Sequence, residues 1–151
     1  MKTRFLMLFL FAILSGACSS DDSQPAEDRL TFGGENYALT LAQYDTFQAS
    51  LTNFSLLNYP GGTHSLNLQF GAITEIPDGK YEFREIDDAD YDPDKHFAGG
   101  ALYIAPNNEP IPITGGWVRF SKKGDEYKIT FDVETAAGRV KGNYVGPLIQ
   151  I

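Results

Sequence analysis

The clearest pattern of apolar and polar residues lies in residues 115–148. In its middle, four apolar residues alternate with four polar ones, at Tyr127, Ile129, Phe131 and Val133. Because successive side chains of a strand point to opposite faces of a sheet, this period of two predicts a strand with one buried and one wet face. The same alternation predicts a strand before it, through Val118 and Phe120, and another after it, through Val140 and Tyr144.

Glycines separate these three strands. Gly124 lies late in the first short connection and Gly138 in the second, which is typical of tight hairpin turns. Gly142 lies inside the third strand and predicts a bulge or a close backbone approach, and Pro147 predicts a strand end. The stretch is therefore expected to be three sequential antiparallel strands.

Weaker alternation continues upstream. Turn residues at 33–34, 60–62 and 77–79 separate the apolar runs, and residues 106–112, with three prolines, are expected to be a loop. A break is expected near Asn53, because Leu51 falls out of phase with Phe54. The predicted strand regions upstream are 30–41, 48–58, 66–70, 81–83 and 101–105.

These regions add up to about eight strands, and no stretch has helical periodicity. The prediction is an all-β fold with a single antiparallel β-domain. Sequential turns favour a lipocalin-like up-and-down barrel, and a two-sheet β-sandwich is the alternative.

The N-terminal segment has the pattern of a secretory signal peptide. Lys2 and Arg4 precede an apolar run of ten residues and then the small residues 15–17. Ten apolar residues are too few for a membrane-spanning helix, which needs about 20. The expected organisation is a signal peptide at 1–17, a lipidated cysteine with a disordered tether at 18–29, and the β-domain at 30–151.

Cys18 is the only cysteine of the chain, so no disulfide can form within it. The segment Leu14-Ser15-Gly16-Ala17-Cys18 resembles the lipobox of bacterial lipoproteins, which implies cleavage before Cys18 and its acylation. Ser19-Ser20-Asp21-Asp22 resembles the acidic export signal of Bacteroidetes surface lipoproteins. The pattern of residues 115–148 is also similar to the C-terminal part of uncharacterised lipoproteins of that group. The resemblance implies a lipid anchor in the outer membrane and display on its outer face. It implies no catalytic residues.

Charge narrows the choice of partners. The chain has 20 acidic and 12 basic residues, a net charge of −8. Without residues 1–17 there remain ten basic and twenty acidic residues, a net charge of −10. Nucleic acid is excluded as a partner, because its binding needs basic residues that neutralise phosphates.

One acidic loop suggests a cation. Carboxylates alternate along it, at Asp88, Asp90, Asp92 and Asp94, which is typical of oxygen-rich Ca²⁺ loops. Pro93 stands where an EF-hand needs glycine, and a solvated loop is the simpler interpretation. No other cofactor is expected.

Two histidines, His64 and His96, lack spaced partners for a zinc site. There is no Gly-x-Ser-x-Gly motif for a hydrolase nucleophile. The chain is therefore expected to be no enzyme, with a hydrolase of unrecognised site as the remaining alternative.

Aromatic residues are the other candidates for ligand binding. Trp117, the only tryptophan, is expected on the wet face of its strand near Arg119, where it could stack on a sugar ring or a partner. Tyr91, Phe97 and Tyr103 could form a rim near the acidic loop. The hypothesis is a non-catalytic binding or accessory domain for a small molecule, glycan or protein; a lipocalin-like carrier of a small apolar ligand is the alternative.

Overall fold

The computed structural model describes residues 28–47 and 50–151, which form twelve β-strands and no helix. The strands are β1 (Arg29–Phe32), β2 (Glu35–Ala38), β3 (Leu41–Phe47), β4 (Leu51–Leu57), β5 (His64–Phe70), β6 (Gly79–Phe83), β7 (His96–Phe97), β8 (Gly99–Ile104), β9 (Ile111–Lys123), β10 (Glu126–Thr135), β11 (Gly138–Gly146) and β12 (Leu148–Gln150). The all-β prediction is confirmed. The predicted number of eight was too low, because residues 29–47 hold three strands where one was expected and because β7 and β12 were not predicted.

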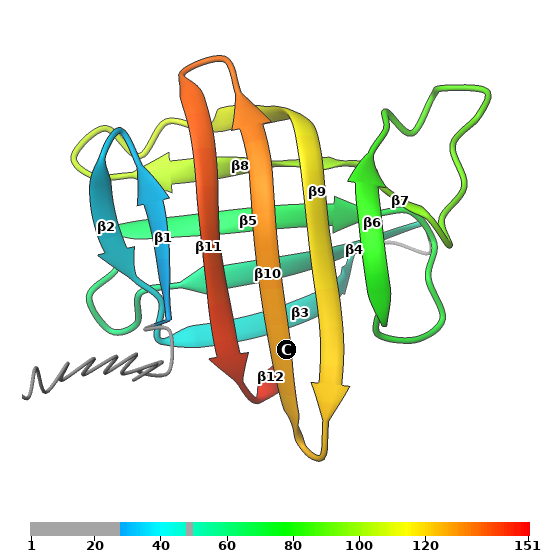
Figure 1. The fold of residues 1–151 in the computed structure, drawn as a ribbon, viewed down its shortest axis with the longest axis horizontal. Helices are drawn as coiled ribbons and strands as arrows, with labels where there is room; N and C mark the ends of the chain where they lie inside the picture. The colour runs from blue at the N-terminus through cyan, green and yellow to red at the C-terminus, as the bar shows by residue number, and fades with distance from the viewer. Residues whose placement is uncertain (1–27, 48–49) are drawn as a thin grey trace, which may run out of the picture.

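All twelve strands belong to one continuous, curled sheet (Figure 1). Its order is β12-β3-β4-β5-β8-β9-β10-β11-β1-β2, with β6 and β7 branching from β9. Two pairs are parallel, β12 with β3 and β6 with β7, so the prediction of purely antiparallel pairing was wrong. Within the described ranges no ladder joins β2 to β12, and a closed lipocalin-like barrel is not confirmed.

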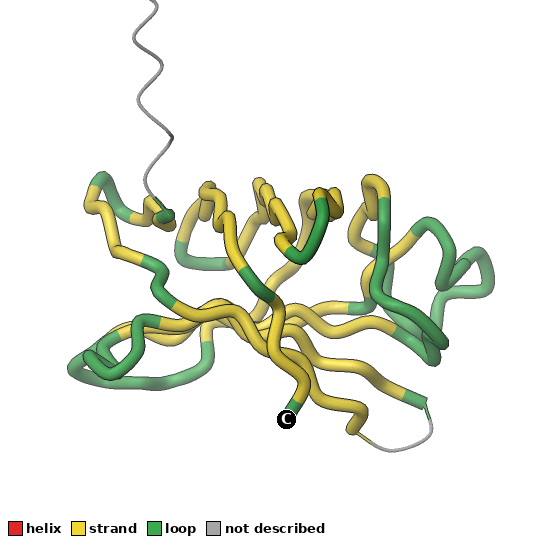
Figure 2. The backbone as a smooth tube through the Cα atoms, turned by 90° about the horizontal axis from the view of Figure 1, so that it is seen from below, coloured by secondary structure: helices red, strands yellow, loops and turns green. Residues whose placement is uncertain are grey.

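The curled sheet folds over to make two layers that face each other (Figure 2). One layer, called sheet A, contains β2, β1, β11, β10, β9, β6 and β7. The other, called sheet B, contains β12, β3, β4, β5 and β8. Figure 1 shows the strands of sheet A running across those of sheet B, as in orthogonal packing, where a single strand turns the corner between the layers.

Strand β9 is that corner strand. Ile111 and Pro112 pair with β8 in sheet B, and the rest of β9 pairs with β10 and β6 in sheet A. The register with β10 shifts between Gly115, which pairs with Glu134, and Ile113, which pairs with Thr135, and the adjacent Gly116 has a φ of 98°. A methyl group on Gly116 would lie 2.2 Å from the carbonyl oxygen of Asp132, so only glycine fits here. Because β9 begins at Ile111, residues 111 and 112 belong to this strand and not to the predicted loop 106–112.

The three predicted strands of residues 115–148 are confirmed as β9, β10 and β11. Along β10 the side chains alternate between exposed and buried positions. The β10–β11 register is unbroken, so Gly142 makes no bulge there. It makes the close approach instead: a methyl group on it would lie 2.1 Å from the carbonyl oxygen of Arg29. Pro147 separates β11 from β12, as predicted.

Aromatic side chains join the two layers. Phe54 of sheet B lies with its ring centroid 5.0 Å from that of Phe120 in sheet A, and 5.3 Å from that of Phe70. All three are almost completely buried. Burial of each such side chain contributes about 1.5–3 kcal/mol, so the interior between the layers is a packed core.

Strand β4 corrects one expectation from the sequence. It runs without a break from Leu51 to Leu57, and its register with β3 and β5 is continuous. Thr52, which is 5% exposed, takes the inward place before Phe54. Thr52 therefore keeps the alternation of inward and outward positions that Leu51 seemed to break.

Asp28 fixes the point where the described chain enters β1. Its carboxylate accepts a hydrogen bond of 2.7 Å from the backbone N–H of Val145, in β11. Its backbone carbonyl accepts a second bond, of 2.8 Å, from the N–H of Leu39. One residue therefore ties the start of β1 to elements on both of its sides.

Candidate functional site

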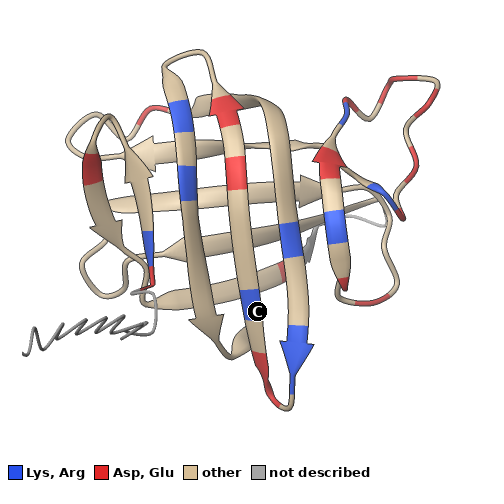
Figure 3. Ribbon diagram, in the orientation of Figure 1, with Lys and Arg blue, Asp and Glu red and all other residues tan. Residues whose placement is uncertain are grey.

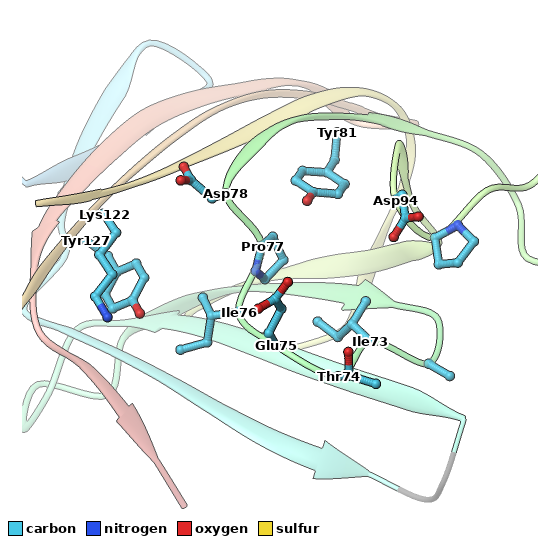
Figure 4. A pocket seen from close by; sticks show the side chains of 12 residues that line it. Ile73, Thr74, Glu75, Ile76, Pro77, Asp78, Tyr81, Asp94, Lys122 and Tyr127 are labelled. Carbon is cyan, nitrogen blue, oxygen red and sulfur yellow. The ribbon is translucent and has the colours of Figure 1, made fainter.

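A hollow of about 570 Å³ lies at one end of the molecule, where residues 71–78 connect β5 to β6 (Figure 4). We call this connection the mouth loop and the hollow the mouth pocket. Side chains of both layers flank the loop. Tyr81 and Tyr127 of sheet A line the mouth pocket, while Tyr44 and Phe54 of sheet B line a second hollow of about 220 Å³ beside it. The loop therefore lies between the layers, at their open end.

Apolar and acidic groups meet in the mouth pocket. Ile73 and Ile76 supply apolar surface, and Glu75, Asp78 and Asp94 supply carboxylates. Burial raises the pKa of the Tyr81 phenol, and these carboxylates raise it further although a hydrogen bond with the backbone of Asp78 lowers it. Lys122 is the basic residue of the lining, with its Nζ 5.5 Å from the Tyr127 ring centroid. The exposed lining of the pocket is therefore mostly polar, and the two isoleucines are its apolar part.

Tyr91 connects the mouth loop to the acidic loop. Its hydroxyl accepts a 2.8 Å hydrogen bond from the N–H of Gly71, the first residue of the mouth loop. A methyl group on Gly71 would lie 2.8 Å from this hydroxyl oxygen. Tyr91 therefore packs between the two loops, and its role in a ligand-binding rim stays a prediction.

Two carboxylates of the acidic loop, those of Asp88 and Asp92, accept hydrogen bonds from the loop backbone and from neighbouring basic side chains. Asp88 accepts hydrogen bonds from the backbone of Asp90 (2.9 Å) and from Arg84 (3.1 Å). Asp92 accepts bonds from Lys95 and from the backbone of Asp94. These bonds lower the pKa of both carboxyls: the Asp90 N–H is the main cause for Asp88, and Lys95 for Asp92.

The four predicted calcium ligands do not converge. Asp90 lies near Arg84, with Oδ2 3.7 Å from its guanidinium, whereas Asp94 faces the mouth pocket. No group of three or more acidic, histidine or cysteine residues suited to a metal occurs in ranges 28–47 and 50–151. Calcium binding stays a prediction that this geometry does not support.

Both histidine rings form hydrogen bonds with nearby backbone groups, and His64 also with a side-chain hydroxyl. His64 is buried, with Nε2 2.6 Å from the carbonyl oxygen of Ala38 and Nδ1 2.9 Å from the Thr63 hydroxyl. His96 accepts a 2.9 Å hydrogen bond at Nδ1 from the N–H of Asp92. Each therefore serves as a local structural link.

A shallow basin of about 340 Å³ lies on the outer face of sheet A, beside Trp117. Trp117 is half-buried and points away from the core that Val118 and Phe120 fill, as predicted. Lys80, from β6, holds its Nζ 5.4 Å from the ring centroid. We call this hollow the Trp117 basin; its polar lining is Arg29, Thr31, Thr130, Asp132, Lys141 and Asn143.

Strand registers place the basin residues, together with Arg119 beside the basin, in two rows. One row runs from Trp117 through Asp132 and Lys141 to Thr31, and the other from Arg119 through Thr130 and Asn143 to Arg29. Asp132 is the central acceptor of the first row. It takes a bidentate contact from Arg139, at 2.5 and 2.9 Å, and lies 3.5 Å from Lys141. Ion pairs thus fix the orientation of its carboxylate.

The predicted aromatic candidates do not come together. Trp117 lies on the outer face of sheet A, whereas Phe97 is fully buried in the core against Phe70 and Phe83, so an exposed role for it was wrong. Tyr103 lies on the outer face of sheet B, in a hollow of about 300 Å³ with Tyr59. Only Trp117 combines an outward position with a charged, polar hollow.

The sequence interpretation overlooked Asp132, Lys141 and Asn143. The signal was available, because they occupy outward positions in the same alternating strands that predicted the fold. What the sequence does not show is which outward residues share a row. Cross-strand register decides that.

The predicted lipidation site, Cys18, lies outside the described residues. Within 28–47 and 50–151, no helix is long and apolar enough to span a membrane. Comparisons with protein-family models, with curated proteins and with solved structures found no match.

Proposed function

We propose that this chain is an outer-membrane-anchored lipoprotein, displayed on the cell surface, with a non-catalytic binding or accessory β-domain. In this proposal the outer face of sheet A is the binding surface. The observation that carries it is Trp117, an outward aromatic ring beside a basin lined by hydrogen-bonding side chains. An aromatic ring beside polar groups suits a ligand with both flat apolar faces and hydroxyls, such as a glycan.

The anchor part rests on the sequence. Cys18 follows a signal-like segment, and the acidic residues after it resemble the export signal of surface lipoproteins. More than one acyl chain gives stable anchoring, at about 0.8 kcal/mol per buried CH₂. Such an anchor would keep the β-domain at the membrane without a spanning helix.

Fractionation tests the anchor. The natural chain should sediment with membranes, and the Cys18→Ala variant should move to the soluble fraction. A Cys18→Ala chain that still floats with membranes in a density gradient would refute lipid anchoring. Protease added to intact cells should degrade the natural chain if the domain faces outward, and survival until the cells are lysed would contradict surface display.

Fluorescence tests the binding surface directly, because Trp117 is the only tryptophan in the chain. The full chain in detergent is titrated with neutral and acidic polysaccharides, and binding should change the emission of Trp117. Tyr59→Ala, which removes an exposed ring that is not part of sheet A, is the matched control. If no polysaccharide changes the emission, the sheet A face is not a glycan-binding surface.

A second proposed function is the carrier of a small apolar ligand, with the mouth pocket and its two isoleucines as the candidate site. Its volume of about 570 Å³ is within the range of small-molecule sites. In this alternative the curled sheet acts as a lipocalin-like barrel with the ligand at its mouth, because Phe54, Phe70 and Phe120 fill the interior.

An apolar dye tests the carrier alternative. Binding of 1-anilinonaphthalene-8-sulfonate should fall in an Ile76→Asp variant, which adds charge to the apolar wall. An exposed-site variant of the same chemistry, Ile86→Asp, should bind as the natural chain does, since Ile86 is 45% exposed and is not part of the pocket lining. Equal binding by all three proteins would contradict a carrier.

A further inference from the structure

The outer face of sheet A is rich in basic residues although the chain as a whole is acidic. The strands of sheet A contain eight lysines and arginines against five acidic residues. Lys122 and Glu35 are in the inward phase of their strands, which leaves seven basic against four acidic residues on the outer face, an excess of three positive charges. The whole chain has a net charge of −8. Figure 3 shows these basic residues spread over the strands of the front layer. The face is thus a local positive region.

Ion pairs account for only some of these cations. Arg139 and Lys141 contact Asp132, and Lys80 contacts Glu82 at 2.9 Å. The side chains of Arg119 and Lys128 have no hydrogen bond or ion pair with any residue in the part of the chain described here. Both are exposed. They are available to an anionic ligand without the loss of an existing contact.

Arg119 lies next to the tryptophan. The two residues are two positions apart on β9, so their side chains leave the same face of the strand. Across the ladders, Arg119 is opposite Lys80 on one side and Thr130 on the other. A flat aromatic ring, a forked guanidinium and the polar basin therefore lie side by side on β9, β10 and β11.

We propose that the Trp117 basin binds an acidic polysaccharide whose sugars have carboxylate groups. This inference rests on the proposed binding function and names its ligand class. A sugar ring stacks on Trp117, and Arg119 takes the carboxylate with two parallel hydrogen bonds. The oriented Asp132 carboxylate and the Thr130 hydroxyl accept hydrogen bonds from sugar hydroxyls.

Hydrogen-bond chemistry favours an acidic glycan over nucleic acid, because the net charge of −8 acts on both polyanions alike. Asp132, an acceptor at the centre of the basin, matches the many hydroxyl donors of a sugar chain. A phosphate backbone offers no donor in return.

The experiment compares two ligands that differ only in charge. Polygalacturonate and its fully methyl-esterified form have the same sugar ring, but only the first has carboxylates. Emission of Trp117 in the full chain reports binding of each. We expect the natural chain to bind polygalacturonate more tightly, and Arg119→Gln to weaken this binding about tenfold, as for the loss of a charge-assisted hydrogen bond. Binding of the ester should be unchanged in this variant.

Lys123→Gln is the matched control, because it removes the same charge from an exposed position at the end of β9. It should bind polygalacturonate as the natural chain does. An equal loss in both variants would show general charge attraction and would overturn the assigned role of Arg119.

The outcomes separate this inference from the proposed function. If both ligands bind equally and Arg119→Gln has no effect, the glycan-binding function stands and the acidic class is wrong. If neither ligand binds and the neutral polysaccharides also fail, the proposed binding function fails with it. Tighter binding of a single-stranded oligonucleotide than of polygalacturonate would overturn the ligand class in favour of nucleic acid.

Discussion

The two outer faces of the curled sheet differ in charge although the same core holds them together. The strands of sheet A contain eight basic residues, whereas those of sheet B contain none and a single acidic residue, Asp45. Outward positions of sheet B are uncharged polar residues instead, among them Asn53, Ser55, Asn67 and Gln69.

Folding does not require this difference. Inward positions of both layers are filled by the same kinds of apolar side chain, and outward positions only need to tolerate water. Tyr103 on sheet B lies among neutral groups, while Trp117 on sheet A lies among ionic ones. The charge of sheet A is therefore a feature that binding, rather than stability, would use.

The largest expected effect comes from the core that both faces share. Phe120→Ala should destabilise the fold by about 3–5 kcal/mol, because the cavity cannot be filled by neighbouring strands. Phe54→Ala should cost a similar amount, and the double variant less than the sum, since the two rings are in contact. Urea unfolding measures this, and strictly additive losses would mean that the two layers are stabilised independently.

A smaller loss is expected where β9 passes from one layer to the other. Gly116→Ala should cost about 1–3 kcal/mol, because the added methyl group meets backbone at 2.2 Å and the φ of 98° is unfavourable for alanine. Thermal unfolding measures this loss. Thr114→Ala, a change at an exposed neighbour in β9, is the control. Equal midpoints would show that the strand can shift to accept the methyl group.

Binding sharpens the comparison of the two faces. Trp117→Ala should weaken polygalacturonate binding about tenfold, as expected for a lost stacking contact of 1–2 kcal/mol. Tyr103→Ala, the corresponding change on sheet B, should leave it unchanged. Isothermal titration calorimetry measures both, because the first variant has no tryptophan. Weaker binding in Tyr103→Ala alone would move the site to the other face.

The ion pairs of sheet A should contribute little to stability. Arg139→Ala is expected to change the urea midpoint only slightly, because the arginine is 55% exposed and water screens its pair with Asp132. Unfolding is compared at low and high salt, and any small difference between the variant and the natural chain should disappear at high salt. A midpoint shift as large as that of Gly116→Ala would mean that the pair is structural.

The smallest expected effect is a change in the pKa of one carboxyl group, that of Glu82. The hydrogen bond from Lys80 lowers the pKa of Glu82 below its ordinary value of 4.5. The pair is therefore complete above this value and is lost as the pH falls through the lower, folded-state pKa. Carboxyl carbon NMR should give a midpoint below 4.5, and Lys80→Gln should return it toward 4.5. A midpoint above 4.5 in the natural chain would contradict the pairing.

Alternation was enough to predict the long strands. Tyr127, Ile129 and Phe131 define both the strand and its buried face, because a one-residue slip would expose all of them. The short strands β7 and β12 contain only two and three residues, which is too few for any period to show. Hydrogen bonds with neighbouring strands define them instead, and a single sequence does not reveal these.

The candidate site was predictable only in part. Trp117 followed from the alternation around Val118 and Phe120. The corner of β9 looked like part of a plain strand, because it depends on a register shift against β10 between Ile113 and Gly115. The mouth pocket was missed because Ile73 and Ile76 lie in a connection without a period and gain their surroundings only when the layers meet.

Asp28 gives the proposed arrangement a mechanical consequence. With the membrane anchor at Cys18 and a polymer held at the Trp117 basin, tension would enter the domain at Asp28 and leave through the rows of sheet A. Arg29 and Thr31 pair with β11 next to this entry point, and the Asp28–Val145 hydrogen bond closes the ladder at its loaded end. The force would therefore act within sheet A and not across the aromatic core. A pull on the cell surface would shear β1 against β11 before it separated the two layers.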